Sequence, residues 1–299
     1  MKLFHPTTVL GVALLLVSLL QVAVGSRFDA EARRASARGA EAGFPLDDAW
    51  IHQVYARSFA EHGRLDYNPG DAEVGQSSLL WGVLLAPVHA AASAFDVPVP
   101  RATRVFGIVI WIALAFAVAL LVLSLPVPGA PFGALCGALL VALDPALAFA
   151  AVSGMEPLLF ALLLVLATAA LVRRRFLLLG LGVGLSILAR PEGLLFGGLL
   201  VVAAAFRGPD PDRGATDAPL GRLLRAALPA ALLAAVWGAY CAAVSGRPFP
   251  NTWYQKVADV GLGEAFTGGL ALLGGTLAGS PFFESYIGYL FLLIGVVAL

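Results

Sequence analysis

Long apolar runs separated by short polar segments dominate the pattern of hydrophobic and polar positions along this chain. Most runs approach the roughly 20 residues that an α-helix needs to cross a lipid bilayer. The pattern therefore predicts an all-α, polytopic integral membrane protein. The runs lie at 9–24, 79–95, 104–125, 131–150, 155–172, 176–206, 226–244 and 283–299, and the sequence ends inside the last one.

Two of these runs are not expected to be single crossings. The run at 79–95 is short and contains Pro87 and His89, so we predict a juxtamembrane helix along the outer interface. The run at 176–206 is too long for one helix and is interrupted by the residues ARPEG. We therefore predict two short crossings there, at 176–189 and 193–206.

This map divides the chain into three parts. Residues 1–25 are expected to form a first transmembrane helix or signal anchor. A cleaved signal peptide is the alternative, because the apolar core is short and small residues follow it. Residues 26–103 are expected to form an extracytoplasmic loop with juxtamembrane helices, and residues 104–299 a transmembrane helix bundle that ends within an apolar helix.

Basic residues give the expected sidedness. Short loops rich in arginine and lysine favour the cytoplasm, which places Arg173, Arg174, Arg175 and the polar loop 207–225 inside. Alternating crossings then bring distant polar segments to the outer face, where we expect them to share one cavity. These segments are PLDDAWIHQVYA (45–56), SGMEP (153–157), ARPEG (189–193) and RPFPNTWYQK (247–256). Arg101 and Arg104 also fall outside, against the rule.

Composition agrees with a membrane protein and narrows the functional classes. The chain is 60% hydrophobic and 13% charged, with a mean hydropathy of +0.88. Its 19 basic and 19 acidic residues cancel, so we expect no nucleic-acid partner. Cys136 and Cys241 lie in apolar runs, and the histidines lack ligand spacing, so we expect no metal site.

Two adjacent carboxylates, Asp47 and Asp48, begin a predicted outer helix. Asp48 shares a helical stripe with His52 and Tyr55, whereas Asp47 is rotated by roughly 100° and is placed to cap the helix. Either aspartate alone is also typical of a capped interfacial helix. Two adjacent carboxylates near a membrane repel each other and favour a perturbed pKa. After this helix, DYNPG (66–70) indicates a turn.

The ordered set of polar segments resembles a known family. In sequence order it comprises DDAWIHQVYARSFAEHGRLDYNPGD, VGQSSLLW, SGMEPLLFALLL, GLSILARPEGLLF and GRPFPNTWYQKV. This set resembles the GT-C superfamily of polyprenyl-phosphate-sugar glycosyltransferases, in particular the mycobacterial terminal arabinofuranosyltransferase type and its bacterial relatives. The resemblance covers nearly the whole chain. Relatives are usually longer, which would make this chain a truncated one.

The resemblance implies an inverting, multi-pass enzyme of the plasma membrane with its active site on the extracytoplasmic side. Such an enzyme moves a sugar from a polyprenyl-phosphate carrier to a hydroxyl of a glycan, glycolipid or protein, without a cofactor. It implies an acidic catalytic base at the first outer loop, matched by Asp47 and Asp48. It also implies a second acidic residue at the outer end of a later helix, which Glu156 matches. An arginine at the start of the second crossing is matched, by position alone, by Arg101 or Arg104.

The residues themselves suggest roles for that chemistry. We predict Asp48 as the base and Asp47 as its partner or cap, with the reverse assignment open. Arg190 and Lys256 are candidates for the departing phosphate. Each has a structural alternative, since Arg190 can pair with Glu192 and Lys256 can reach the membrane interface. Glu156, which can also be a first-turn acid, completes the expected substrate-binding set together with His52, Tyr55, Asn251 and Tyr254.

Two other functions remain open from the sequence. A transporter would also contain short, broken helices and intramembrane charges, but it predicts internal repeats with matching breaks, and no convincing second copy is present. A truncated, non-catalytic membrane subunit is the other alternative. The sugar, lipid carrier and acceptor, and any need for a divalent cation, are not determined by the sequence.

Overall fold

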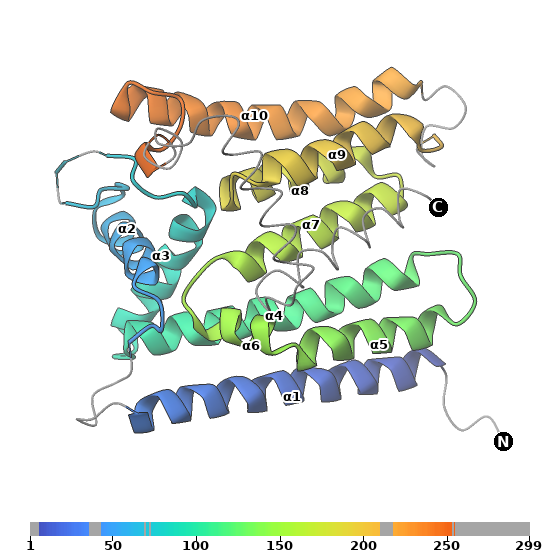
Figure 1. Ribbon diagram of the computed structural model, residues 1–299, viewed down its shortest axis with the longest axis horizontal. Coiled ribbons are helices and arrows are strands. Elements are labelled where there is room, and N and C mark those ends of the chain that lie inside the picture. The colour runs from blue at the N-terminus through green and yellow to red at the C-terminus, as the bar shows by residue number, and fades with distance from the viewer. Residues whose placement is uncertain are drawn as a thin grey trace, which may run out of the picture.

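The computed structural model describes residues 6–35, 43–68, 70, 71, 73–209, 218–252 and 254. Within them the regular structure is α-helical, as predicted, and the long helices run side by side (Figure 1). The helices are α1 (Pro6–Ala35), α2 (Asp48–His62), α3 (Leu79–Ala94), α4 (Val99–Leu123), α5 (Ala130–Leu143), α6 (Pro145–Val152), α7 (Pro157–Val172), α8 (Phe176–Ala189), α9 (Gly193–Phe206) and α10 (Pro219–Ser245).

Several helices are suited to a membrane by length and composition. Among the described residues, these are α4, α10 and the segment Leu10–Phe28 of α1, with the bent pair α5 and α6 as a fourth if it counts as one span. Helices α3, α7, α8 and α9 are apolar but shorter. A helix of 14 residues is roughly 21 Å long, less than the hydrocarbon core of about 30 Å. The chain is therefore a membrane protein whose short helices do not count as spans by themselves.

Three predicted boundaries move. Helix α10 begins at Pro219 instead of residue 226. Helix α1 continues to Ala35 instead of ending near residue 25. Helix α4 begins at Val99, after Pro98 and with a proline in its first turn, a position that suits proline because its missing N–H is not needed there. Arg101 and Arg104 therefore lie inside the first turns of α4, and the predicted boundary at 103 falls within a helix. The predicted crossing at 283–299 lies outside the described residues.

The crossing predicted over 131–150 is not one continuous helix, because the chain breaks at Asp144 and bends by 58° between α5 and α6. A residue before proline avoids the helical conformation, and Asp144, before Pro145, is extended at φ −71° and ψ 116°. Its Oδ1 accepts hydrogen bonds from the backbone N–H groups of Ala146 (2.8 Å) and Leu147 (3.1 Å). Asp144 thus ends one helix and caps the next.

Helix α4 lies within the core and contacts α1, α5, α6 and α7. Its Trp111 and Leu114 are fully buried. Gly107 of α4 permits close packing on α6, since a Cβ atom there would overlap the carbonyl oxygen of Ala151. Helix α1 is tied to α4 by Gln21, which is fully buried and donates from Nε2 to the Trp111 carbonyl at 3.1 Å.

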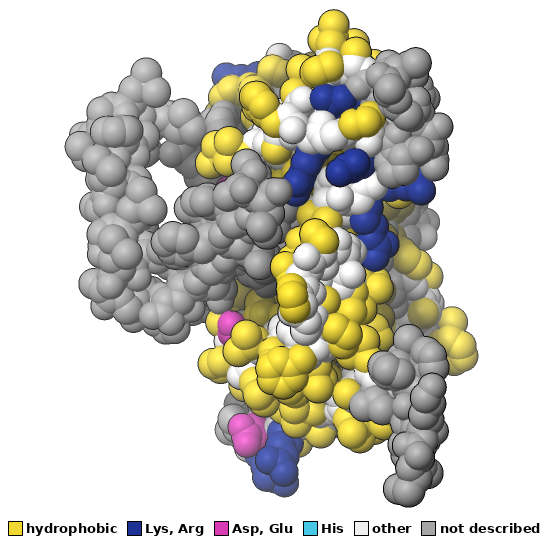
Figure 2. All heavy atoms as spheres, turned by 90° about the vertical axis from the view of Figure 1, so that its right-hand side faces the viewer, with side chains coloured by type: hydrophobic (Ala, Val, Ile, Leu, Met, Phe, Trp, Pro, Cys, Tyr) yellow, Lys and Arg dark blue, Asp and Glu magenta, His cyan; other side chains and the backbone are white. Residues whose placement is uncertain are grey.

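The two ends of the bundle differ in chemistry. Helices α2 and α3, the α6–α7 and α8–α9 turns and the C-terminal end of α10 gather at the left-hand end in Figure 1. The opposite end carries the connection between α7 and α8, with the exposed Arg173, Arg174 and Arg175, and Figure 2 shows arginine side chains gathered over its upper part. Helix α7 separates Glu156 from Arg173 by roughly 24 Å.

Candidate functional site

Glu156 lies in the turn between α6 and α7 and is only 3% exposed. It occupies the N-cap position of α7 and precedes Pro157, which begins the helix. Its position depends on Gly154, whose φ of +81° is unfavourable for other residues. A Cβ atom on Gly154 would lie 2.5 Å from the Phe44 ring and 3.1 Å from Ala49 Cβ. The turn that carries Glu156 is therefore packed directly against the start of α2.

Arg190 reaches Glu156 from the break between α8 and α9. Its backbone is extended before Pro191, which ends α8. Nη1 of Arg190 lies 2.8 Å from Glu156 Oε1, and Nη2 lies 3.0 Å from Glu192 Oε1. The Arg190–Glu192 pair considered from the sequence is thus present. Because Glu192 is half exposed and Glu156 is buried, the contact with Glu156 is the less screened of the two.

His52 contacts the other oxygen of the same carboxylate. Its Nε2 lies 3.2 Å from Glu156 Oε2, and both side chains are about 95% buried. Within the described part of the chain, neither Glu156 Oε2 nor His52 Nδ1 has a hydrogen bond of acceptable geometry. The contact is therefore a close electrostatic one, and it leaves buried polar atoms that need a further partner such as water or a ligand.

These contacts determine the charge of Glu156. Burial raises the pKa of its carboxyl, but the adjacent His52 ring and the Arg190 guanidinium together outweigh that effect. The pKa therefore lies below its ordinary value, and Glu156 is ionised at neutral pH. A buried carboxylate fixed by an arginine from a distant segment is suited to orienting a polar ligand, not to donating a proton.

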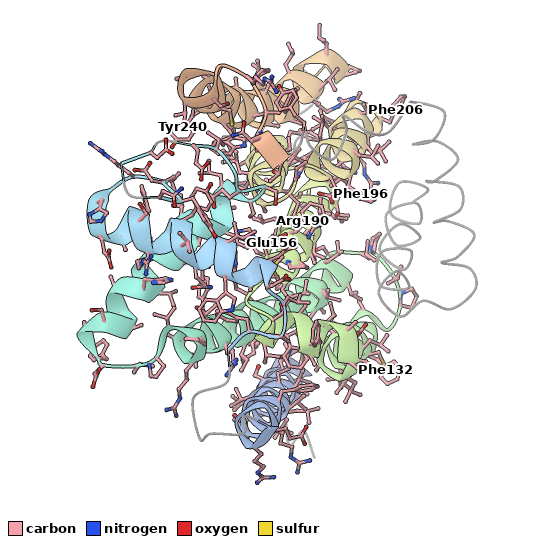
Figure 3. All side chains as sticks on the ribbon, turned by 60° about the vertical axis from the view of Figure 1, so that its left-hand side comes forward. Phe132, Glu156, Arg190, Phe196, Phe206 and Tyr240 are labelled. Atoms are coloured by element: carbon pink, nitrogen blue, oxygen red, sulfur yellow. The ribbon has the colours of Figure 1, made fainter. Side chains whose placement is uncertain are left out.

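Asp47 and Asp48 are both exposed at the start of α2. Asp47 is the N-cap residue, and its Oδ1 accepts from the backbone N–H of Asp48 at 3.0 Å. Asp48 lies one helical turn before His52, which places their Cβ atoms roughly 6 Å apart. The tandem aspartates thus begin the helix from which His52 contacts Glu156, and Figure 3 shows Glu156 and Arg190 lying together near the start of α2.

Tyr55, Arg104 and Arg101 lie outside this cluster. The Tyr55 hydroxyl accepts from the backbone N–H of Gly75 at 2.9 Å, and burial raises the pKa of Tyr55 to about 12. Arg104 is 5% exposed and donates from Nη2 to the Gly43 carbonyl at 2.5 Å. Both residues thereby hold loops against helices. Arg101 is exposed in the first turn of α4.

The predicted residues beyond α10 meet a different loop. The backbone N–H of Asn251 donates to the Val74 carbonyl at 2.8 Å. The Arg247 guanidinium lies over the Tyr254 ring, with its Cζ 4.9 Å from the ring centroid. The first contact brings Asn251 to the loop before α3, whereas Tyr254 packs against the segment that follows α10. The described contacts do not join either residue to Glu156. Lys256 lies outside the described residues.

A buried polar group on the adjacent face of α2 was missed from the sequence. Gln53 Oε1 lies 2.7 Å from His89 Nε2 and 3.4 Å from the Thr103 hydroxyl, so it joins α2, α3 and α4. The sequence signal for this buried polar contact was His89, because a polar residue within an apolar run needs a polar partner. Among the described residues, no group of three or more histidine, cysteine or acidic side chains is arranged to hold a metal ion.

No protein family model, curated protein or solved structure matches the chain. The interpretation of this site therefore depends on its residues and their geometry.

Proposed function

We propose that the chain is an inverting membrane glycosyltransferase. It would move a sugar from a polyprenyl-phosphate carrier to a hydroxyl of a glycan, glycolipid or protein on the extracytoplasmic side of the plasma membrane. The observation that supports this most strongly is the convergence of His52, Glu156 and Arg190 from three distant segments at one end of the bundle, with Asp48 one helical turn before His52. The reaction class itself comes from the resemblance to GT-C enzymes.

In this proposal Asp48 is the general base. Its carboxylate takes the proton from the acceptor hydroxyl while the hydroxyl oxygen bonds to the anomeric carbon of the sugar. The bond from that carbon to the phosphate oxygen breaks, and its electron pair leaves with the polyprenyl phosphate. Asp48 is exposed where an acceptor from water can reach it, and Asp47 already has a capping role. A positioned base typically contributes about 10²- to 10⁴-fold in rate.

Glu156 is proposed to orient the sugar, with Arg190 holding it in place. The Arg190 guanidinium is shared between two carboxylates, which weakens its attraction for a phosphate. Arg104 is similarly occupied by the Gly43 carbonyl. We therefore assign the departing phosphate to Arg101, exposed at the start of α4, and to Lys256, which retains the role proposed from the sequence.

The sidedness of the proposal follows from charge. The end of the bundle with Arg173, Arg174 and Arg175 is assigned to the cytoplasm, because basic loops favour that side. The end with Glu156 then faces outward, where lipid-linked sugars replace nucleotide sugars as donors.

A transporter is the second candidate, and the bent pair α5 and α6 favours it. Helices broken within a bundle, here by 58° at Asp144, are a recurring feature of substrate paths in transporters. The exposed Asp48, proposed as a general base, has no evident use in that function.

Reconstituted liposomes separate these functions. The full chain is incorporated with a radiolabelled polyprenyl-phosphate sugar, arabinofuranosyl or mannosyl, and supplied with an oligosaccharide acceptor, with and without EDTA. Label in the acceptor supports the transferase. Movement of label across the bilayer without transfer supports the transporter and contradicts our proposal. If label is neither transferred nor moved, the chain is a non-catalytic subunit, which also contradicts the proposal.

A further inference from the structure

A polar cavity lies against α2, apart from the Glu156 cluster. It measures about 130 Å³, on the order of ten times the space that one water requires. Its lining comes from two segments: one face of α2 and the loop that follows. The lining residues are Val54, Arg57, Ser58, Glu61, His62, Asp66 and Tyr67.

The local sequence explains how this cavity forms. Gly63 ends α2 with φ of +66° and donates its N–H to the Phe59 carbonyl, so the chain reverses and returns along the helix. Leu65 and Asp66 are buried on that return. Tyr67 remains 42% exposed, with its ring 5.8 Å from that of Tyr55. Asp66 and Ser58 thus form a buried floor, and Arg57, Glu61, His62 and Tyr67 form an exposed rim.

The floor of the cavity contains a buried hydroxyl without a partner. Asp66 is 4% exposed and Ser58 is 8% exposed. Over the residues that the structure describes, the Ser58 hydroxyl has no hydrogen bond, and Asp66 lines the cavity beside it. An aspartate is almost never this deeply buried unless it is paired, and a buried polar atom without a partner is costly. A ligand that donates hydrogen bonds would remove that cost.

Charge narrows the class of ligand. Arg57 contributes one positive charge and Asp66 and Glu61 contribute two negative charges, so the formal charges of these three side chains sum to −1. A phosphate or carboxylate is therefore disfavoured. A metal ion is disfavoured by the arginine on the rim. Hydroxyl groups, which both donate and accept, suit the mixture of carboxylates, guanidinium and serine, and the exposed tyrosine ring offers an apolar face for a sugar.

We propose that this cavity binds a neutral, hydroxyl-rich carbohydrate as a subsite for the acceptor, an assignment that rests on the proposed transferase function. Ser58 lies roughly 15 Å along α2 from Asp48. An acceptor chain of several sugars is long enough to occupy the cavity while its terminal hydroxyl reaches the proposed base. The cavity would then select extended acceptors and leave donor binding unaffected.

Direct binding tests the cavity without requiring catalysis. The full chain in nanodiscs is titrated with methyl mannoside, methyl arabinofuranoside and their short oligomers, and binding is followed by saturation-transfer NMR and calorimetry. We expect Asp66→Asn to weaken oligomer binding about ten- to a hundredfold, the effect of losing a charged hydrogen-bond acceptor. Asp71→Asn, an exposed carboxylate of the same loop outside the cavity, should leave binding unchanged.

A second variant covers the case in which Asp66→Asn does not fold. Arg57→Gln changes an exposed rim residue, which folding should tolerate, and should weaken binding several-fold. The proposal is overturned if no oligomer binds the unaltered chain, if binding survives unchanged in these variants, or if inorganic phosphate displaces the sugar.

Transfer assays separate failure of the cavity from failure of the proposed function. Sugar binding that depends on Asp66, in a chain without transfer activity, would support the carbohydrate site and contradict the proposed transferase function. If both Asp66→Asn and Arg57→Gln transfer sugar with an unaltered KM for the acceptor, the transferase function is supported and the acceptor subsite is contradicted.

Discussion

Asp48 and Glu156 show how surroundings give similar carboxylates different properties. Asp48 is exposed in the first turn of α2 and has an aspartate beside it that already caps the helix. Glu156 is buried between an arginine and a histidine that come from other segments. One carboxylate is thus accessible to a reacting hydroxyl, and the other is fixed.

The first prediction compares the tandem aspartates. Asp48→Asn should lower sugar transfer by about 10²- to 10⁴-fold, because it removes the proposed base. Asp47→Asn is the matched control, since asparagine caps a helix about as well as aspartate, and it should remain close to wild type. Initial rates with saturating donor measure both. The opposite ranking would assign the base to Asp47.

The second prediction concerns Glu156 and pH. Glu156→Gln should destabilise the fold by about 3 kcal/mol, near the lower end for breaking a buried ion pair, because Arg190 is partly exposed and keeps Glu192. The folded-state pKa of Glu156 is depressed below 4.5. Its stabilisation is therefore complete above the unfolded-state pKa and is lost as pH falls through the folded value.

Unfolding midpoints in detergent between pH 7 and pH 3 measure this dependence. The difference in stability between wild type and Glu156→Gln should shrink as pH falls below 4.5. A difference that stays constant with pH would show that Glu156 contributes through packing instead of charge.

The elements around the site are positioned by a small number of backbone features. The turn between α6 and α7 requires Gly154, and the break between α8 and α9 requires the extended Arg190 before Pro191. These features bring Glu156 and Arg190 together although 34 positions separate them in the sequence. Turns at the ends of helices thus position Glu156 and Arg190, and the helices that these turns join are apolar.

The third prediction tests that turn. Gly154→Ala should destabilise the fold by roughly 2 to 5 kcal/mol, since alanine adds left-handed strain and overlaps Phe44. Gly63→Ala is the matched control: its φ is +66° and a Cβ atom there would meet nothing within 4 Å, so it should cost about 1 to 2 kcal/mol. Denaturant titration of both variants gives the comparison. Equal costs would show that contact with Phe44 is unimportant.

At the scale of the molecule, labelling tests which end of the bundle faces outward, as proposed for the Glu156 end, and which faces the cytoplasm. Cys136 and Cys241 are first replaced by alanine, and single cysteines are then placed at the exposed positions of Glu61 and Arg174. We expect a membrane-impermeant maleimide to label Glu61→Cys in intact cells and Arg174→Cys only after permeabilisation. The reverse pattern would place the Glu156 cluster in the cytoplasm and exclude lipid-linked sugar donors at that site.

The sequence predicted those helices whose ends are marked by proline or charge. The runs at 79–95, 155–172, 176–189 and 193–206 agree with α3, α7, α8 and α9 within a few residues. The break at Asp144 was missed even though the dipeptide of Asp144 and Pro145 carried its signal, because the long apolar run around it was given more weight.

The side-chain contacts of the site were less predictable. The pairing of Arg190 with Glu192 follows from proximity along the chain. The contacts of Glu156 with His52 and Arg190 depend on how α2, α7 and α8 pack, which hydropathy does not encode. Asp66 illustrates the same limit: the sequence indicated a turn at 66–70, but its burial arises only when the loop returns onto α2.

The Trp81 indole of α3 donates to the Gly154 carbonyl at 3.0 Å, in the same turn that packs against Phe44 and Ala49. Because α2 and α3 also pack extensively on each other, these three parts form one mechanical unit. Helix α2 therefore cannot act as a hinged lid over Glu156 without carrying α3 and the turn along with it. For the proposed transferase, we therefore expect an acceptor to bind without displacing α2 relative to α3.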